Sequence, residues 1–459
     1  MNIRHYIYIL AALLSFSGCG KEFLDIKRDA KQVIPKTIDD YQALLDRYNN
    51  INGGASVSLG LIGAGEYTLP DIAITKWKGM IPYEANGYLW AEDIYEDKES
   101  TDWNNAYHRI LYTNLALEVD EISPSPKDQE AWNNVKGSAL FFRAYSYYQL
   151  AQLFCKPYDA STAASDPGVP LKLDYDVTEE VSRGTVADVY KQIVNDLEAA
   201  YTLVPDRQIN VFRPAKAAVA ALLARTYLQM GNYERAGHYA DLGLQSRSEL
   251  TDYNALDLTK AATFPSDYGA TNPEILLYMF INKPGSTYEA GYDVEEGTLN
   301  LYEEADLRRQ AYFTTSAAGF TTFKASFAGP YNIFAGLSTS ELWLMRAESR
   351  ARLGDRDGAL SDLNSLRVNR YDADEYAPAT AANADEVLAL IVEERRKEFY
   401  FRGITWEDLR RFNKEPQFAR TLVREAFGEQ YKLAPGDVRW VWPLPKNEIE
   451  LNGLEQNPR

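Results

Sequence analysis

Histidine and cysteine supply many catalytic bases, nucleophiles and metal ligands, and this sequence holds few of either. Its 459 residues include three histidines and two cysteines. His108 and His238 fall within helical patterns, and no G-x-S-x-G turn occurs, so a Ser-His-Asp hydrolase has no support. H-E-x-x-H, paired C-x-x-C and G-x-x-x-x-G-K-[ST] are also missing. The sequence predicts no catalytic residue, no metal site and no cofactor.

The 66 acidic side chains leave one enzymatic alternative open. A glycosidase needs two carboxyl groups at a set separation, which the fold fixes and spacing in the sequence does not reveal. The formal net charge of −18 at pH 7 repels phosphate backbones. This charge argues against nucleic acid as a partner.

The N-terminal segment combines Arg4, a short apolar run and a Ser-Gly pair before Cys19. This order is typical of a secretory signal, and the run is too short to span a bilayer. Small residues before a cysteine also resemble a bacterial lipobox, in which the cysteine is acylated. We expect a signal peptide over 1–18, lipidation of Cys19 and an extended leader over 19–36. The alternative is an ordinary cleaved signal beside an incidental cysteine.

Cys155, the other cysteine, has no partner for an internal disulfide once Cys19 is lipidated. It ends an apolar helical pattern, so we expect a buried and inert thiol.

Apolar residues recur every three or four positions in the N-terminal part, which predicts several helices. Thr37 and Thr185 have the type and position of helix N-caps. Pro124 and Pro126 separate two long patterns, which favours an antiparallel helix pair. The helices are expected from 37, over 102–117, over 128–154, and from 185 to Pro205.

Two later segments resemble each other, namely 220–244 and 342–366. Each has a glycine at a helix–helix junction and an alanine five residues after it, as in tetratricopeptide units. Such units bury their apolar faces by stacking on one another. Two regions, 49–100 and 250–337, are instead irregular and rich in aromatic residues, with short strands expected in the first and a strand over Glu274–Ile281 in the second. The predicted fold is mainly α, a tetratricopeptide-like scaffold with loop-rich insertions.

Five segments follow one another along the chain: FFRAYSYYQLAQLF (141–154), GVPL (168–171), RGTVADVYKQIVNDLEAA (183–200), IVEERRKEFYFRGITWEDLRRF (391–412) and WPLPKNEIELNGLEQNP (442–458). Together, and in this order, they resemble the signature segments of the SusD/RagB family. The chain departs from the family pattern in ending at Arg459 without Gly-Tyr, and in an insertion over 155–167. From the residues alone, 391–412 is an ion-paired helix packed on the repeats, and the prolines near 443 indicate a fixed tail.

The resemblance implies a SusD-like domain over 37–459, with an N-terminal part over 37–250 and a C-terminal part over 251–459. It implies a binding protein rather than an enzyme, located at the outer membrane and cell surface of Bacteroidota-type bacteria. Its expected partners are a glycan ligand and a SusC-like TonB-dependent transporter. Alternatives are a peptide-binding or protein-interaction scaffold of the same fold, and a glycoside hydrolase.

Aromatic side chains on loops suit sugar rings, which have apolar faces and polar edges. The resemblance implies a ligand surface built from the two irregular regions, although no family motif assigns the contacts. The predicted ligand-binding residues are Trp77, Tyr83, Asn86, Tyr88, Tyr288 and Tyr292, with Trp90, Tyr302 and Tyr331 as further aromatics of these regions.

Overall fold

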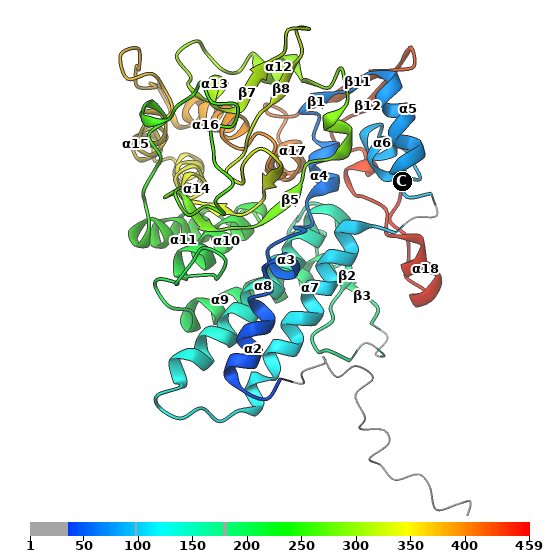
Figure 1. Ribbon diagram of the computed structural model, residues 1–459, viewed down its shortest axis with the longest axis vertical. Helices are drawn as coiled ribbons and strands as arrows, with labels where there is room; N and C mark the ends of the chain where they lie inside the picture. Colours follow the sequence, from blue (N-terminus) through cyan, green and yellow to red (C-terminus); the bar gives the residue numbers. More distant parts are fainter. Residues whose placement is uncertain (1–34, 97–98, 177, 179–180) are drawn as a thin grey trace, which may run out of the picture.

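The computed structural model describes residues 35–96, 99–176, 178 and 181–459. These residues form a mainly helical molecule with short strands, as the sequence predicts (Figure 1). The predicted signal peptide, Cys19 and most of the leader lie outside them. Within the described part of the chain, no helix is both long enough and apolar enough to cross a membrane.

The N-terminal helices form a bundle at the lower end of Figure 1. Its centre is α8, whose residues from Gly137 to Phe154 are all buried because α7 and α9 pack on it. The bundle helices are α2 (Ile38–Leu45), α7 (Thr101–Leu117), η2 (Glu118–Glu121), α8 (Gln129–Phe154) and α9 (Val186–Leu203).

The predicted N-caps are confirmed at both positions. Thr37 and Asp40 form a reciprocal capping box at α2, and Thr185 and Asp188 form one at α9. Each box satisfies two backbone N–H groups that the first helical turn cannot pair internally.

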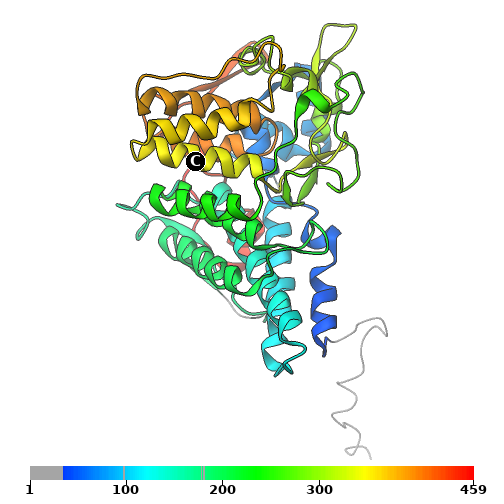
Figure 2. The ribbon, with the colours of Figure 1, turned by 90° about the vertical axis from the view of Figure 1, so that its left-hand side faces the viewer.

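The two repeat segments form helical pairs that stack on the bundle and on each other (Figure 2). Close approach requires small residues: a Cβ at Gly243 would lie 2.8 Å from the Leu342 side chain. Ala224 and Ala347 are fully buried in the same stack. The helices of this part are α10 (Lys216–Gln229), α11 (Tyr233–Ser246), α14 (Thr339–Arg352), α15 (Arg356–Arg367), α16 (Ala384–Glu398) and α17 (Ile404–Phe412).

The first irregular region is more helical than predicted. It contains one short strand, and its prolines begin helices rather than interrupt them: Pro70 is the N-cap of α5 and Pro82 is at the first position of α6. Proline suits that position because its missing N–H would be unpaired there anyway. The elements are α3 (Tyr48–Ile51), α4 (Ser58–Gly63), β1 (Tyr67–Thr68), α5 (Asp71–Met80) and α6 (Pro82–Tyr88).

The strands pair two by two in antiparallel register, in the combinations β1–β6, β2–β3, β4–β10, β5–β9, β7–β8 and β11–β12. The strand predicted over Glu274–Ile281 is present as two pieces, β4 and β5. The strands are β2 (Pro167–Pro170), β3 (Arg183–Thr185), β4 (Ile275–Leu277), β5 (Phe280–Asn282), β6 (Asp293–Val294), β7 (Phe313–Thr315), β8 (Thr321–Phe323), β9 (Asn332–Phe334), β10 (Leu337–Ser338), β11 (Leu422–Ala426) and β12 (Glu429–Leu433). The remaining short helices are η3 (Tyr253–Ala255), η4 (Gly285–Tyr288), α12 (Glu296–Leu299), α13 (Arg308–Tyr312), η5 (Val438–Trp440) and α18 (Lys446–Asn452).

The segment 391–412, predicted as one helix, is two helices. Phe401 and Gly403 both have a positive φ, 58° and 78°, and separate α16 from α17. A Cβ at Gly403 would lie 2.9 Å from Val57, so glycine is needed there for space as well as for backbone conformation. The ion-paired, structural character predicted for the segment is confirmed: Arg395 on α16 bonds Asp408 on α17 at 2.7 Å.

A fully buried ion network ties the second irregular region to α16. Glu398 accepts hydrogen bonds from Arg370 at 2.8 Å and from Arg308 at 3.0 Å, and Arg370 also pairs with Glu274 at 2.8 Å. Burial alone would raise the pKa of Glu398, but Arg370 and Arg308 hold it below its ordinary value. The insertion is therefore anchored to the scaffold by charge as well as by apolar packing.

The C-terminal tail packs on the body as predicted, with α18 added to the expected extended chain. Asn457 Nδ2 donates to the carbonyls of Phe154 and Trp442, at 2.9 and 2.8 Å. Cys155 is buried beside this contact, and burial raises the pKa of its thiol to about 12, as expected for an inert cysteine.

Candidate functional site

The structure separates the predicted ligand-binding residues into buried and exposed groups. Asn86, Tyr88 and Tyr292 are buried, and this corrects their prediction as surface contacts; Trp90 and Tyr302 are buried as well. Tyr83 is partly buried against the core, and burial raises the pKa of its hydroxyl. Tyr288 and Tyr331 are exposed.

The buried residues have specific partners that keep them from the surface. The Tyr88 hydroxyl accepts a hydrogen bond from the Leu69 N–H at 3.0 Å, and the Arg424 guanidinium lies 3.8 Å from the centre of its ring. The Tyr292 ring packs 5.6 Å from that of Tyr67. The Tyr292–Tyr67 contact joins the two irregular regions below the surface, and the Tyr88 contacts fix the first region on itself and on β11.

Trp77 is also mainly structural, because it fixes η4 on α5. Its ring packs directly against Gly285, where a Cβ would lie only 2.2 Å from the indole. The indole N–H donates to Glu289 at 3.1 Å, and the same carboxylate pairs with Lys76 at 2.5 Å. Trp77 is 9% exposed, so it offers a ligand little of its own surface.

Glu84 completes the support of η4, and no pattern in the sequence predicts this role. Its carboxylate accepts the N–H groups of Gly285 and Ser286 at 3.0 and 2.9 Å. These N–H groups have no intrahelical partners, so a buried carboxylate there both satisfies and orients them. The partners lie about two hundred residues apart in the chain, too far for any local pattern to reveal.

Tyr288 and Tyr331 form what we call the tyrosine platform. They are 60% and 71% exposed, and the Tyr288 hydroxyl lies 3.5 Å from the Tyr331 carbonyl oxygen. The pairing of β5 with β9 places Tyr331 beside Lys283, whose N–H donates to the same carbonyl at 3.3 Å. Burial lowers the pKa of the Lys283 amine to about 8, and its Nζ donates to the Phe323 carbonyl at 3.0 Å.

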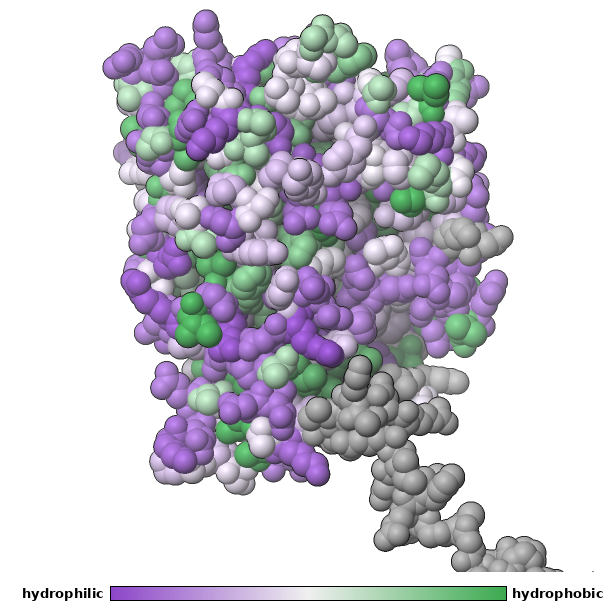
Figure 3. Space-filling model, in the orientation of Figure 1, coloured by the Kyte–Doolittle hydropathy of each residue, from purple (hydrophilic) through white to green (hydrophobic). Residues whose placement is uncertain are grey.

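The platform has the chemistry of a sugar-binding surface. Two exposed rings provide apolar faces. Glu289, the residue after Tyr288, forms an ion pair with Lys76, and this pair adds a donor and an acceptor for hydroxyl groups. On the face of the molecule drawn in Figure 3, hydrophilic residues surround small apolar patches. In the part of the chain that the structure describes, no group of three or more His, Cys, Asp or Glu residues could hold a metal ion.

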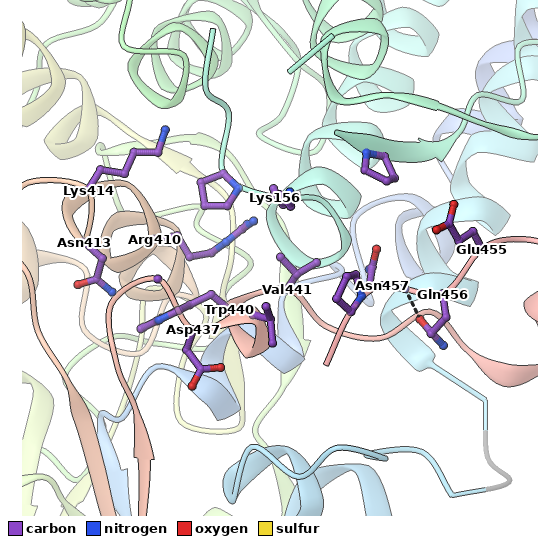
Figure 4. A pocket seen from close by; sticks show the side chains of 15 residues that line it. Lys156, Arg410, Asn413, Lys414, Asp437, Trp440, Val441, Glu455, Gln456 and Asn457 are labelled. Atoms are coloured by element: carbon purple, nitrogen blue, oxygen red, sulfur yellow. Dashed lines mark hydrogen bonds between the residues drawn. The ribbon is translucent and has the colours of Figure 1, made fainter. Parts of the chain in front are cut away.

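A separate pocket of about 440 Å³ lies where the C-terminal tail meets the body (Figure 4). Its lining is largely apolar, with Trp440, Val441 and several prolines. Arg410 reaches into it but donates to the carbonyls of Gln152 and Cys155, and so caps the C-terminus of α8. This guanidinium is therefore engaged by the protein itself.

Known proteins are similar to this chain over most of its length. One family model, described as "Starch-binding associating with outer membrane", matches residues 22–228, and a second, described as "SusD family", matches residues 338–459. The SusD-like protein P2 of Formosa agariphila is 24% identical, over 99% of each chain.

Solved structures share the fold. A SusD superfamily protein from Bacteroides thetaiotaomicron matches with a TM-score of 0.73 at 24% identity, over 92% of this chain and 100% of that one. A putative sugar-binding protein from Bacteroides vulgatus matches with a TM-score of 0.73 at 21% identity, over 93% and 99% of the two chains. A SusD-like carbohydrate-binding protein from the same species has a TM-score of 0.70 at 20% identity, over 91% and 97%.

Proposed function

Because this chain belongs to the SusD family, we propose that it captures oligosaccharide outside the cell and delivers it to a TonB-dependent, SusC-like transporter in the outer membrane. The names of its relatives support carbohydrate as the ligand class and the outer membrane as the location. The protein acts by binding, and the chemistry of glycan cleavage belongs to other proteins.

The tyrosine platform is the observation on which this proposal rests. Tyr288 and Tyr331 hold large ring surfaces in water, and exposed rings on a rigid support gain most when a ligand covers them. Glu84, Gly285 and Trp77 fix the turn that carries Tyr288, so little conformational entropy is lost on binding.

Lipidation of Cys19 is part of the same proposal. An anchor keeps the binding surface next to a transporter and so raises the effective concentration of captured ligand there. Cys19→Ala should release the protein from the membrane fraction while leaving its fold and its ligand affinity unchanged. Retention of the variant in the membrane would contradict the anchor.

The ligand class is tested with a glycan array and peptide pools against the folded chain. We expect retention on one or more glycans and none on peptides.

Tyr288→Ala and Tyr331→Ala should each weaken the glycan interaction by about tenfold, a typical loss for an aromatic contact. Tyr175→Ala is the matched control, since Tyr175 is 47% exposed and is not part of the platform. Equal glycan affinity of all three variants and the native chain would contradict the proposed site.

A further inference from the structure

A groove of about 620 Å³ lies apart from the tyrosine platform and is not used by the function proposed above. It is formed by the connection between α9 and α10, with residues 209–212, and by a turn of the second irregular region, with residues 267–273. Ile209 and Tyr268, both in its lining, are 79% and 49% exposed. The groove thus combines an open space with uncovered apolar surface.

Tyr268 occupies a backbone position that is unfavourable for its type. The Ala270 N–H donates to the Asp267 carbonyl at 3.2 Å, and Tyr268 and Gly269 between them have φ values of 57° and 77°. A turn with two positive φ values favours Asn-Gly, because a bulky side chain in the left-handed region is strained. The turn therefore carries a large ring at a cost in backbone energy.

The ring is held by neighbouring rings yet keeps about half of its surface in water. Its centroid lies 6.0 Å from Tyr48, 5.9 Å from Phe212 and 6.0 Å from Tyr278, in tilted or edge-on geometry. Tyr48 is itself 39% exposed. The cluster fixes the orientation of Tyr268, as the support of η4 fixes that of Tyr288.

Polar groups stand around the ring in the groove lining. The Asn272 Oδ1 accepts the Glu274 N–H at 2.9 Å, whereas its buried Nδ2 has no hydrogen-bond partner among the described residues. Arg247 and Thr271 line the same groove. The Arg247 guanidinium donates to the Pro273 carbonyl at 2.6 Å and pairs with Glu249 at 3.5 Å, and it has further N–H groups beyond these. An exposed aromatic face beside such a guanidinium matches the apolar face and the hydroxyl edge of a sugar.

The groove and the tyrosine platform are separate sites, but a close contact between their segments limits the distance between them. Gly329 packs on Ser266 so closely that a Cβ there would lie 2.2 Å from the Ser266 hydroxyl and 3.1 Å from its Cα. Tyr331 follows Gly329 by two residues, and Tyr268 follows Ser266 by two. Two residues span at most about 7 Å, so the Cα atoms of Tyr268 and Tyr331 lie within about 20 Å of each other.

We propose that the groove at Tyr268 is a second carbohydrate subsite, which binds a distal part of the same glycan chain whose near part covers Tyr288 and Tyr331. The inference rests on the proposed function and adds length selectivity to it. A short oligosaccharide covers one site. A long one covers both, and the second contact is then intramolecular, which raises its effective concentration.

The test uses Tyr268→Asn, which removes the ring while suiting the left-handed backbone. Phe427→Asn is the matched control: Phe427 and Gly428 have φ values of 54° and 76° in the β11–β12 turn, and Phe427 is 47% exposed. Titration calorimetry is run with length ladders, from disaccharide to octasaccharide, of α-glucan, mannan, xylan and galactan. Tyr268→Phe, which keeps the ring, should bind like the native chain.

For the glycan series that the protein binds, we expect Tyr268→Asn to bind the shortest ligands with the affinity of the native chain. Its affinity for the longest ligands should fall by about tenfold or more, which is less than the full gain that two linked contacts can give. Phe427→Asn should be unchanged at every length. Equal affinity of Tyr268→Asn and the native chain at all lengths overturns the subsite, and so does an equal loss at all lengths. Failure of the platform is recognised separately, because Tyr288→Ala would then bind every length normally.

Discussion

The helical scaffold and the loop-rich cap, our name for the two irregular regions together, use the same type of aromatic residue in opposite ways. On α8, Tyr145, Tyr147 and Tyr148 are completely buried, and their hydroxyls are bonded within the protein. In the cap, Tyr288 and Tyr331 are largely exposed. Packing covers every face of α8 from Gly137 to Phe154, whereas short strands and turns leave room for side chains to project. An aromatic residue in this chain therefore indicates function only where its neighbours leave it uncovered.

Disrupting the buried ion network should have the largest effect on the unfolding free energy. Glu398→Ala leaves Arg370 and Arg308 buried without their shared carboxylate, and removing one partner of a buried ion pair costs about 3–5 kcal/mol of unfolding free energy. Urea denaturation measures the loss. Glu393→Ala, on the exposed face of the same helix, is the control and should change the unfolding free energy by less than about 0.5 kcal/mol. Similar values for the two variants would mean that the network does not stabilise the fold.

Tyr288 and Tyr292 lie four residues apart in the cap and allow an exposed ring to be compared directly with a buried one. Tyr292→Ala removes a buried ring and should lower the unfolding free energy by about 3 kcal/mol. Tyr288→Ala removes an exposed ring and should change it by less than about 0.5 kcal/mol while lowering glycan affinity. Thermal denaturation and calorimetry on both variants separate the two roles. A stable Tyr292→Ala variant with weakened binding would return Tyr292 to the ligand surface.

Glu66 should make the junction of cap and scaffold sensitive to pH. Its carboxylate accepts from the Phe401 N–H and the Thr405 hydroxyl, and burial raises its pKa from 4.5 to about 7. The folded state therefore binds this proton more tightly than the unfolded state does. Stability from this group is present below pH 4.5 and is lost as the pH rises to 7, by about 2–3 kcal/mol.

Glu66→Gln removes that titration without a change of shape. The unfolding free energy of the variant, relative to the native chain, should rise between pH 4.5 and pH 7.5, as followed by urea denaturation at each pH. A constant difference across this range would show that Glu66 does not change its protonation there.

Gly285→Ala should lower the unfolding free energy less than the changes at Glu398, Tyr292 and Glu66 do, and it acts at the contact between the two irregular regions. The added methyl would lie 2.2 Å from the Trp77 ring, and overpacking of this kind costs about 1–2 kcal/mol. Because η4 must shift, glycan affinity should fall even though Gly285 touches no ligand. Gly79→Ala is the control, since Gly79 has no positive φ and its added methyl would meet no atom within 4 Å.

The sequence predicted the scaffold better than the cap, for a physical reason. Helix caps such as Thr37 and Thr185, and glycine-marked repeat turns, act over a few neighbouring residues. Pro70 and Pro82 are typical of loops, but proline also begins helices, and both residues begin helices in this structure.

The site residues were harder to separate, because distant contacts decide their burial. Tyr292 is covered by Tyr67, more than two hundred residues before it, and nothing within four residues distinguishes it from Tyr288. The role of Glu84 could not be predicted for the same reason, since its partners are the distant backbone N–H groups of Gly285 and Ser286. The prediction that both irregular regions build one surface stays consistent with these contacts.

The most direct test of the account is a crystal structure of the chain with an oligosaccharide chosen from the array. We predict electron density for a sugar ring against Tyr288 and Tyr331, with its hydroxyl groups near Lys76 and Glu289. A sugar bound instead in the pocket beside Trp440, or on the stacked helices with the two tyrosines uncovered, would contradict the claim that the exposed aromatic residues of the cap bind the ligand.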